Sequence, residues 1–271
     1  DKEKEKLNVE YFGVGDLEVS HNDKFLAFSL DIKGSEYYTI FIRDIETNKI
    51  ITKEISNTSG SITFSLDDKY IFYSKLDKNH RARKVFRHEI GKFDGQDDLI
   101  FEEKSEAFTV SIGLSSDEKY YFITTSDHNT SEQYYFCINE EKPSPKIIMK
   151  RQRGVLYSVN SWNNKFYNHT NKDAEDFKVD ISESISTGLE EELIFTDEKV
   201  CELNISFRQK DKDTDEIYVG YSSPKTPSRV YLYNLSTKSK KLMKEQKIPS
   251  GHNPDDYIVE RVEFKSHDGR L

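Results

Sequence analysis

A six-residue pattern, Ser-x-x-[Asp/Glu/Asn]-Lys-[Phe/Tyr], occurs four times in this 271-residue chain and restricts the folds that the chain can adopt. The copies begin at Ser20, Ser65, Ser115 and Ser161, which are 45, 50 and 46 residues apart. A degenerate fifth copy at residues 215–218 keeps this interval. A pattern that recurs at such a period indicates a fold made of repeated structural units.

Each copy lies between two stretches in which apolar and polar residues alternate. In the first unit, Leu17 and Val19 precede the hexamer, and Leu26, Phe28, Leu30 and Ile32 follow it. Alternation with a period of two is typical of β-strands, and the polar hexamer between them is then the turn of a β-hairpin. Each repeat therefore begins with two antiparallel strands.

Two more strands complete the repeat. Alternating apolar residues at 38–42 and 230–232 predict a third strand in the first and fifth units, and matching turns follow at 44–48 and 234–238. A fourth strand is predicted at residues 50–54 and 241–244. Four strands in a repeat of this length are typical of one blade of a β-propeller.

We therefore predict an all-β fold, a β-propeller of four-stranded antiparallel blades, of which about five are recognisable. The main alternative, a two-sheet sandwich, would not repeat its own turn sequence at this interval. The blades are expected to begin near Asp16, Ser61, Thr109, Tyr157 and Glu202. The fourth blade is expected to be shortened, because residues 180–192 are polar and poor in strand formers.

The blades leave a segment at each end of the chain. Residues 1–15 form an N-terminal lead-in, 16–247 form the propeller, and 248–271 form a linker with the first strand of a further domain. That strand is expected at 257–264, where apolar residues alternate again, and a hairpin is expected near Asp268. The chain is expected to be part of a longer protein, since a domain boundary inside a hairpin is unusual.

Composition excludes several classes of protein. A net charge of −9 with no concentrated basic stretch argues against a nucleic-acid partner, and no apolar run reaches the roughly 20 residues of a membrane span. The hydrophobic content of 35% is low, but aromatic residues at 13% can build a core from few side chains.

Cys137 and Cys201 are expected to be buried reduced thiols in strands, and the protein is expected to be cytoplasmic.

No residue set in the sequence predicts catalysis, a metal site or a cofactor. The seven histidines lack ligand spacing and are expected in loops or at the surface. The basic stretch 80–88 is expected to be a solvated loop, with a partner site as the alternative. The acidic residues at 97–98 and 190–192 are expected to be solubilising surface charge, although they could attract cationic peptides. Two prolines in 221–227 are expected to fix the backbone between strands.

Several stretches resemble the propeller domain of oligopeptidase B, or protease II, in the prolyl oligopeptidase family of serine peptidases. The stretches are 11–12 with 17–20, 84–91 with 98–103, 130–132, 157–159, 173–177, 221–227 and 248–269. The resemblance covers nearly all of the chain in the same order. It departs from the family between Phe177 and about Leu193, where roughly one of the family's seven blades is missing.

The resemblance implies a non-catalytic domain that restricts entry to a peptidase cleaving short peptides after Arg or Lys. Its partner would be a downstream α/β-hydrolase domain that holds the Ser, Asp and His, and no family catalytic residue can be placed on this chain. The nearest match to a Gly-x-Ser-x-Gly elbow is at 113–117, which lacks the second Gly. The alternatives are an autonomous protein- or peptide-binding propeller and a decayed remnant of the peptidase. A ring with fewer blades would expose strand edges, so self-association or marginal stability is expected.

Overall fold

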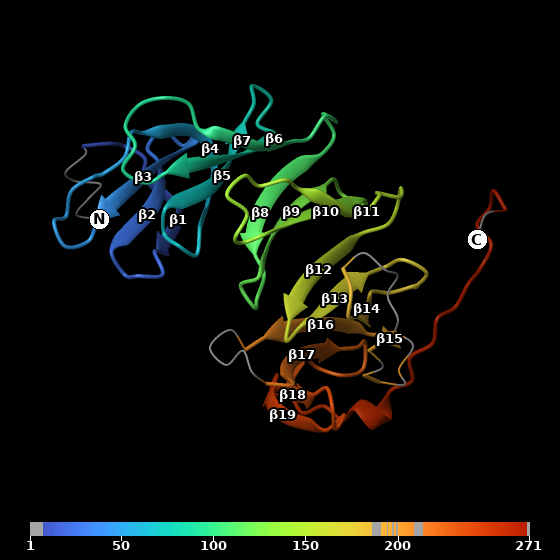
Figure 1. The fold of residues 1–271 in the computed structure, drawn as a ribbon. Helices are drawn as coiled ribbons and strands as arrows, with labels where there is room; N and C mark the ends of the chain where they lie inside the picture. The colour runs from blue at the N-terminus through green and yellow to red at the C-terminus, as the bar shows by residue number, and fades with distance from the viewer. Residues whose placement is uncertain are drawn as a thin grey trace. The chain divides into compact units, whose positions relative to one another are not determined.

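The computed structural model describes residues 8–185, 191–193, 195–196, 198, 200–208 and 214–269. These residues fall into two compact units, Asp1–Leu156 and Tyr157–Leu271. Within the described residues, every regular element is an antiparallel β-strand except one three-residue 3-10 helix (Figure 1). The all-β prediction is confirmed.

The first unit contains blades 1 to 3. Blades 1 and 2 share one seven-stranded sheet in sequence order, and blade 3 is a separate four-stranded sheet. The strands are β1 (Gly13–Val19), β2 (Phe25–Asp31), β3 (Tyr38–Asp44), β4 (Ile55–Phe64), β5 (Tyr70–Leu76), β6 (Ala82–Glu89), β7 (Asp98–Glu102), β8 (Thr109–Leu114), β9 (Tyr120–Ser126), β10 (Ser131–Cys137) and β11 (Lys146–Met149).

The predicted fourth strand of blade 1 at residues 50–54 is wrong. Ile50 makes only an isolated bridge to Arg43 of β3, and regular strand pairing with β3 begins at Ile55, opposite Ile40. Strand β4 then continues into blade 2, where Ile62 lies opposite Tyr73. One ten-residue strand therefore serves two blades, which explains why their sheets are continuous.

The second unit contains blades 4 and 5, each a four-stranded sheet in sequence order. Blade 4 comprises β12 (Tyr157–Trp162), β13 (Lys165–Thr170), β14 (Lys178–Ser182) and β15 (Glu191–Glu192), and blade 5 comprises β16 (Glu202–Phe207), β17 (Glu216–Ser222), β18 (Arg229–Asn234) and β19 (Lys240–Glu245). Strand β15 has only two residues, as expected for the polar stretch 180–192. Residues 186–190 of that stretch lie outside the described residues. All five predicted blade starts fall within the first strand of a blade.

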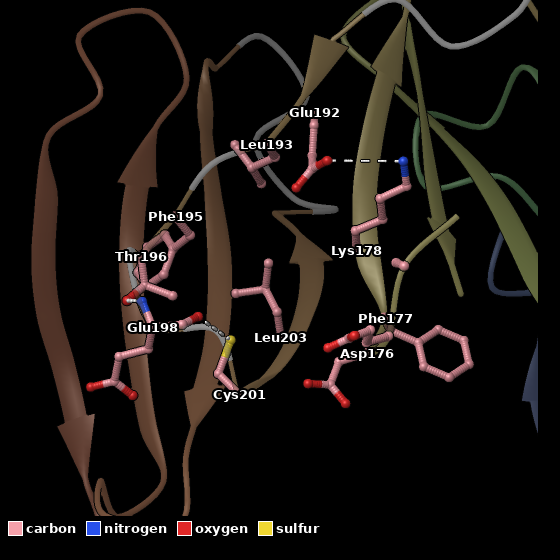
Figure 2. A pocket seen from close by; sticks show the side chains of 12 residues that line it. Asp176, Phe177, Lys178, Glu192, Leu193, Phe195, Thr196, Glu198, Cys201 and Leu203 are labelled. Atoms are coloured by element: carbon pink, nitrogen blue, oxygen red, sulfur yellow. Dashed lines mark hydrogen bonds and ion pairs between the residues drawn. The ribbon is translucent and has the colours of Figure 1, made fainter. Parts of the chain in front are cut away.

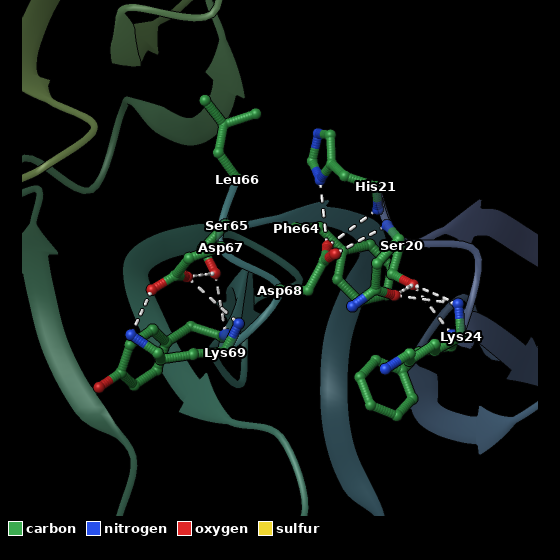
Figure 3. Close-up of polar contacts among 12 residues, drawn as sticks. Ser20, His21, Lys24, Phe64, Ser65, Leu66, Asp67, Asp68 and Lys69 are labelled. Atoms are coloured by element: carbon green, nitrogen blue, oxygen red, sulfur yellow. Dashed lines mark hydrogen bonds and ion pairs between the residues drawn. The ribbon is translucent and has the colours of Figure 1, made fainter.

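The repeated hexamer forms the first hairpin turn of its blade, and its serine holds the turn together (Figure 3). In blade 2 the Ser65 hydroxyl donates to Asp67 at 2.7 Å and accepts from the backbone N–H of Tyr70 at 2.9 Å. Ser20 and Ser115 make the same pair of contacts in blades 1 and 3. A serine at this position therefore satisfies backbone donors that the turn would otherwise leave open.

The fourth hexamer position adopts a left-handed backbone in all four copies. Its φ is 59° at Asp23, 54° at Asp68, 57° at Glu118 and 58° at Asn164. Asp and Asn tolerate this conformation better than most residues, which explains their preference there. The fourth copy has a tighter turn, because Trp162 pairs directly with Lys165, but its serine still lies opposite Phe166.

The second and third hexamer positions contact the following blade. The backbone N–H groups of His21 and Asn22 donate to the buried carboxylate of Asp68 at 2.9 and 2.8 Å. The N–H of Leu66 donates to the Tyr121 hydroxyl at 3.2 Å. In the second unit, Trp162 Nε1 donates to the carbonyl of Thr214 at 3.3 Å. The serine of the hexamer thus closes its own hairpin, while the second and third positions join adjacent blades.

Apolar cores fill the spaces between adjacent blades. In the first unit, Ile40, Ile42, Ile71 and Tyr73 form one cluster between blades 1 and 2. A second cluster centres on Tyr121, Ile123 and Phe136. In the second unit, Trp162, Tyr167, Val219 and Tyr233 pack between blades 4 and 5. Aromatic side chains supply much of this buried volume, which is how a chain of low hydrophobic content builds its core.

Candidate functional site

The basic stretch 80–88 is not a solvated loop, because most of it lies in strand β6. Three of its four Lys and Arg side chains are paired within the first unit, and the fourth, Arg81, is exposed. Arg83 lies 3.1 Å from Asp77, Lys84 lies 3.4 Å from Glu102, and Arg87 lies 2.7 Å from Asp98. Since these three charges already have carboxylate partners, most of the positive charge of the stretch is neutralised within the unit.

The last residue of the basic stretch, His88, is fully buried, so the expectation of loop or surface imidazoles is wrong for it. Its Nε2 lies 2.7 Å from Thr52 Oγ1, and its Nδ1 lies 3.0 Å from Asp97 Oδ1. Asp97 also accepts from the Tyr73 hydroxyl at 2.6 Å and pairs with Lys53 at 3.0 Å. Asp97 is therefore the centre of a buried polar network, whereas its exposed neighbour Asp98 is surface charge as predicted.

The order hydroxyl, imidazole, carboxylate is the order found in hydrolytic triads. Here the group cannot act on a substrate, because Thr52 is 4% exposed and His88 is 0% exposed. Although burial alone would raise it, hydrogen bonds from His88, Tyr73 and Lys53 hold the pKa of Asp97 below its usual range. The network thus keeps a charged carboxylate inside the blade 1–2 interface and has a structural role.

The serine nearest to a nucleophile elbow has the same kind of role. Ser115 lies in the hairpin turn of blade 3, is 3% exposed, and donates to Asp117 at 2.8 Å. A nucleophile elbow needs a strand-to-helix turn that presents the hydroxyl to a substrate. No α-helix follows any strand among the described residues, so this serine has no such setting.

The expectation that both cysteines are buried in strands is wrong. Cys137 is exposed at the end of β10, and Cys201 is partly buried just before β16. Both are free thiols. Burial raises the pKa of Cys201, which keeps this thiol protonated and unreactive near neutral pH.

A second buried charge cluster closes one end of blade 3. Arg151 donates to Glu103 at 2.6 Å and to Glu132 at 2.7 Å, and its guanidinium lies 4.1 Å from the centroid of the Phe108 ring. Both carboxylates are at least nine-tenths buried. Glu132 also accepts from the Tyr134 hydroxyl at 2.8 Å. All of these groups are satisfied, so the cluster joins the end of β7 in blade 2 to β10 and the end of β11 in blade 3, and it leaves none of its own acids or bases free.

The second unit contains a hollow of about 340 Å³ between blades 4 and 5 (Figure 2). Leu193, Phe195 and Leu203 form an apolar wall. Carboxylates of Glu175, Asp176, Glu192 and Glu198 lie around it. Lys178 lies 3.9 Å from Glu192 and is the one cation among the lining residues that the structure describes. The rim is therefore acidic.

The 221–227 stretch joins this hollow to the segment that leaves the propeller. Tyr221 ends the buried part of β17 and donates its hydroxyl to Glu198. The turn that follows is closed by reciprocal backbone bonds of 3.1 Å between Ser223 and Thr226. Lys225 lies 3.7 Å from Glu198, and its carbonyl lies 2.7 Å from His252 Nε2. These contacts close the turn through Ser223 and Thr226, and the part of the two prolines in fixing the backbone stays a prediction.

The predicted strand at 257–264 does not form. The chain passes through a 3-10 helix, Pro254–Asp256, and then runs without a strand partner among the described residues. Ile258 is 88% exposed, Val262 is 70% exposed and Phe264 is 79% exposed. A strand needs a neighbour for its backbone hydrogen bonds, and none of the described blades supplies one.

Among the residues that the structure describes, there is neither a candidate metal site nor a membrane-spanning helix. In the described part of the chain, no group of three or more His, Cys, Asp or Glu residues could hold an ion. No helix formed by the described residues is long and apolar enough to cross a membrane. The polar groups described above act on one another within the blades.

Four-stranded antiparallel sheets with hydrogen-bonded hexamer turns define a β-propeller domain. The sequence profile of the prolyl oligopeptidase N-terminal β-propeller domain matches residues 8–188. The chain belongs to this family.

Known relatives are longer than this chain. Dipeptidyl aminopeptidase BI of Pseudoxanthomonas mexicana is 24% identical over 96% of this chain but 42% of its own length. Protease 2 of Moraxella lacunata is 23% identical over 93% of this chain and 43% of its own. The chain thus spans less than half the length of these relatives. The first alignment runs over 308 positions, more than the 271 residues here, so that relative has residues that this chain lacks.

Solved structures have the same fold. Oligopeptidase B from Leishmania major superposes with a TM-score of 0.67 at 19% identity, covering 99% of this chain and 46% of that one. Oligopeptidase B from Trypanosoma brucei gives a TM-score of 0.65 at 21% identity, covering 99% of this chain and 45% of that one. Both likenesses concern the fold of the propeller part.

Proposed function

We propose that this chain is the non-catalytic, substrate-filtering propeller of an oligopeptidase B-like serine peptidase that cleaves short peptides after Arg or Lys. The relatives are peptidases in which the propeller is the N-terminal part. In this proposal the catalytic Ser, His and Asp belong to a downstream hydrolase domain. The propeller's role is to admit extended peptides and exclude folded proteins by size.

One observation carries the proposal. The exit segment, which we define as residues 246–269, presents alternating apolar side chains to solvent at 258, 262 and 264. Exposed apolar side chains in an unpaired strand-like stretch are stabilised when a neighbouring sheet covers them. A hydrolase domain whose first strand lies in this stretch would supply that sheet.

The chain by itself should show no peptidase activity. Acyl transfer needs an accessible nucleophile, an adjacent base and oxyanion donors, and the one hydroxyl–imidazole–carboxylate series described is sealed inside a blade interface. The measurement is hydrolysis of a fluorogenic arginyl or lysyl amide, with and without a serine-directed phosphonate. Turnover that is blocked by the phosphonate and lost on mutating a serine of this chain would contradict the proposal.

An autonomous peptide-binding propeller, or a decayed remnant, is the second candidate, and the residues missing relative to the aligned peptidase favour it. The encoding gene distinguishes the two. An open frame after Leu271 that contains a Gly-x-Ser-x-Gly elbow supports the filtering role, whereas an early stop codon supports the second candidate. With the longer polypeptide in hand, removal of the propeller should allow cleavage of folded substrates.

We also propose that the protein is cytoplasmic and that the isolated chain self-associates. Two free thiols support the first statement, and cell fractionation tests it. For the second, the edge strand β1 of blade 1 exposes Val14 by 53%, Leu17 by 59% and Val19 by 47%. Sedimentation should show species larger than a monomer, and a monodisperse monomer at all concentrations would refute it.

A further inference from the structure

The exit segment is attached to both blades of the second unit. At blade 5, His252 Nε2 lies 2.7 Å from the Lys225 carbonyl, and the His252 ring stacks on Tyr257 with centroids 5.0 Å apart. At blade 4, Arg261 lies 2.8 Å from Asp176 and 3.1 Å from Glu175. The segment therefore bridges the two blades.

The contact at blade 4 joins residues that are 85 positions apart in the sequence. Glu175 and Asp176 lie on the turn between β13 and β14, where Asp173 adopts a left-handed backbone with φ of 52°. Arg261 Nη1 meets one carboxylate and Nη2 meets the other. A planar guanidinium can bind two acceptors in this way, which a lysine ammonium does less well.

Between its two attachments the segment covers a hollow of about 730 Å³, lined on the blade side by Glu175, Glu198 and Lys225. The stretch from Tyr257 to Arg261 has no strand partner in the described part of the chain. Its position therefore depends on the two ends. Arg261 is 38% exposed and Glu175 is 69% exposed, so salt can screen the contact at the blade 4 end.

We propose that residues 252–261 form an electrostatic strap, in which Arg261 on the acidic turn holds the exit segment against blades 4 and 5. When Arg261 leaves Glu175 and Asp176, the segment remains attached at His252 only and swings away from the hollow. The inference builds on the proposed function, because the strap would then set how tightly a downstream domain is held to the propeller.

Chymotrypsin cleavage after Tyr257 and Phe264 tests the strap, since both rings are exposed and the segment must leave the blades to enter a protease. In low salt, R261A should raise the cleavage rate about two- to five-fold, the range of an exposed ion pair. The difference should disappear in about 1 M NaCl, where screening acts within about 3 Å.

Four controls isolate the contact. K247A removes an exposed cation of the same segment and should leave the cleavage rate of that segment unchanged. Cleavage after the exposed Phe93 of the first unit should proceed at the same rate in wild type and R261A. A synthetic peptide of residues 252–269, with and without R261A, corrects for protease preference. The charge exchange R261D with D176R should restore the low wild-type rate.

Equal corrected rates for wild type and R261A in low salt would overturn the strap, as would an equal acceleration by K247A. If R261A lowers the stability of the protein, the charge-exchange variant still distinguishes the two explanations. A strap predicts that the cleavage rate returns to the wild-type value in this variant, whereas general destabilisation does not. No peptidase readout is involved. Failure of the strap is thus distinct from failure of the filtering role.

Discussion

Replacing Asp97 with alanine should lower the free energy of unfolding by about 3–5 kcal/mol, the usual cost of removing one partner from a buried ionic network. The variant leaves Lys53, the Tyr73 hydroxyl and His88 Nδ1 without their acceptor at the blade 1–2 interface. Urea unfolding followed by far-UV circular dichroism measures the change.

Asp98 provides the matched control, because it is the next residue, is 61% exposed and pairs with Arg87 at the surface. D98A should cost less than about 1 kcal/mol. Equal losses for D97A and D98A would show that the network does not stabilise the interface.

The effect of Asp97 should also depend on pH in a defined direction. Hydrogen bonds hold the folded-state pKa of Asp97 below its unfolded value, so the carboxylate contributes stability above the unfolded pKa of about 4. This contribution is lost as the pH falls through the lower, folded-state value. The stability difference between wild type and D97N should therefore be full at pH 6 and shrink below about pH 4.

Replacing Trp162 with alanine should cost about 3–5 kcal/mol in the second unit, as is usual for a fully buried large ring. The indole packs against Phe207 with centroids 5.5 Å apart and donates to the carbonyl of Thr214. It therefore joins blade 4 to blade 5 by packing and by a hydrogen bond.

Trp162→Phe separates these two contributions. It keeps most of the packing and should cost only about 1–2 kcal/mol, since one hydrogen bond and some volume are lost. Urea unfolding by circular dichroism serves for both variants, because Trp162 is the single tryptophan and its fluorescence is lost. A loss of less than about 1 kcal/mol in W162A would contradict the central place of this ring in the core.

The hexamer explains why the architecture could be predicted. Its serine, its left-handed fourth position and its flanking alternation act within one hairpin, so their physical causes lie within a few residues. Local causes of this kind are visible in sequence, and they repeat wherever the hairpin repeats. The blade starts and the shortened β15 followed from the same local patterns.

The polar sites could not be predicted in this way. Asp97 and Asp98 are adjacent acids, yet one is buried against His88 and the other faces solvent. His88 lies at the end of a basic stretch, and a two-residue alternation does not predict its burial, because the buried positions of β6 are Ala82, Val85 and His88. Thr52, its partner, lies 36 residues away.

The blades can be predicted from sequence alone, because a repeated turn and a two-residue alternation fix hairpins through short-range hydrogen bonds and sterics. Tertiary contacts were needed to show which charged groups are buried, where β4 passes from one blade to the next, and that Arg261 binds an acidic turn 85 residues earlier. These outcomes depend on contacts between distant segments, and the free energy of a charge changes with the groups that pack around it. For the same reason, residues 257–264 alternate like a strand but form none, since a strand requires a partner that the described blades do not provide.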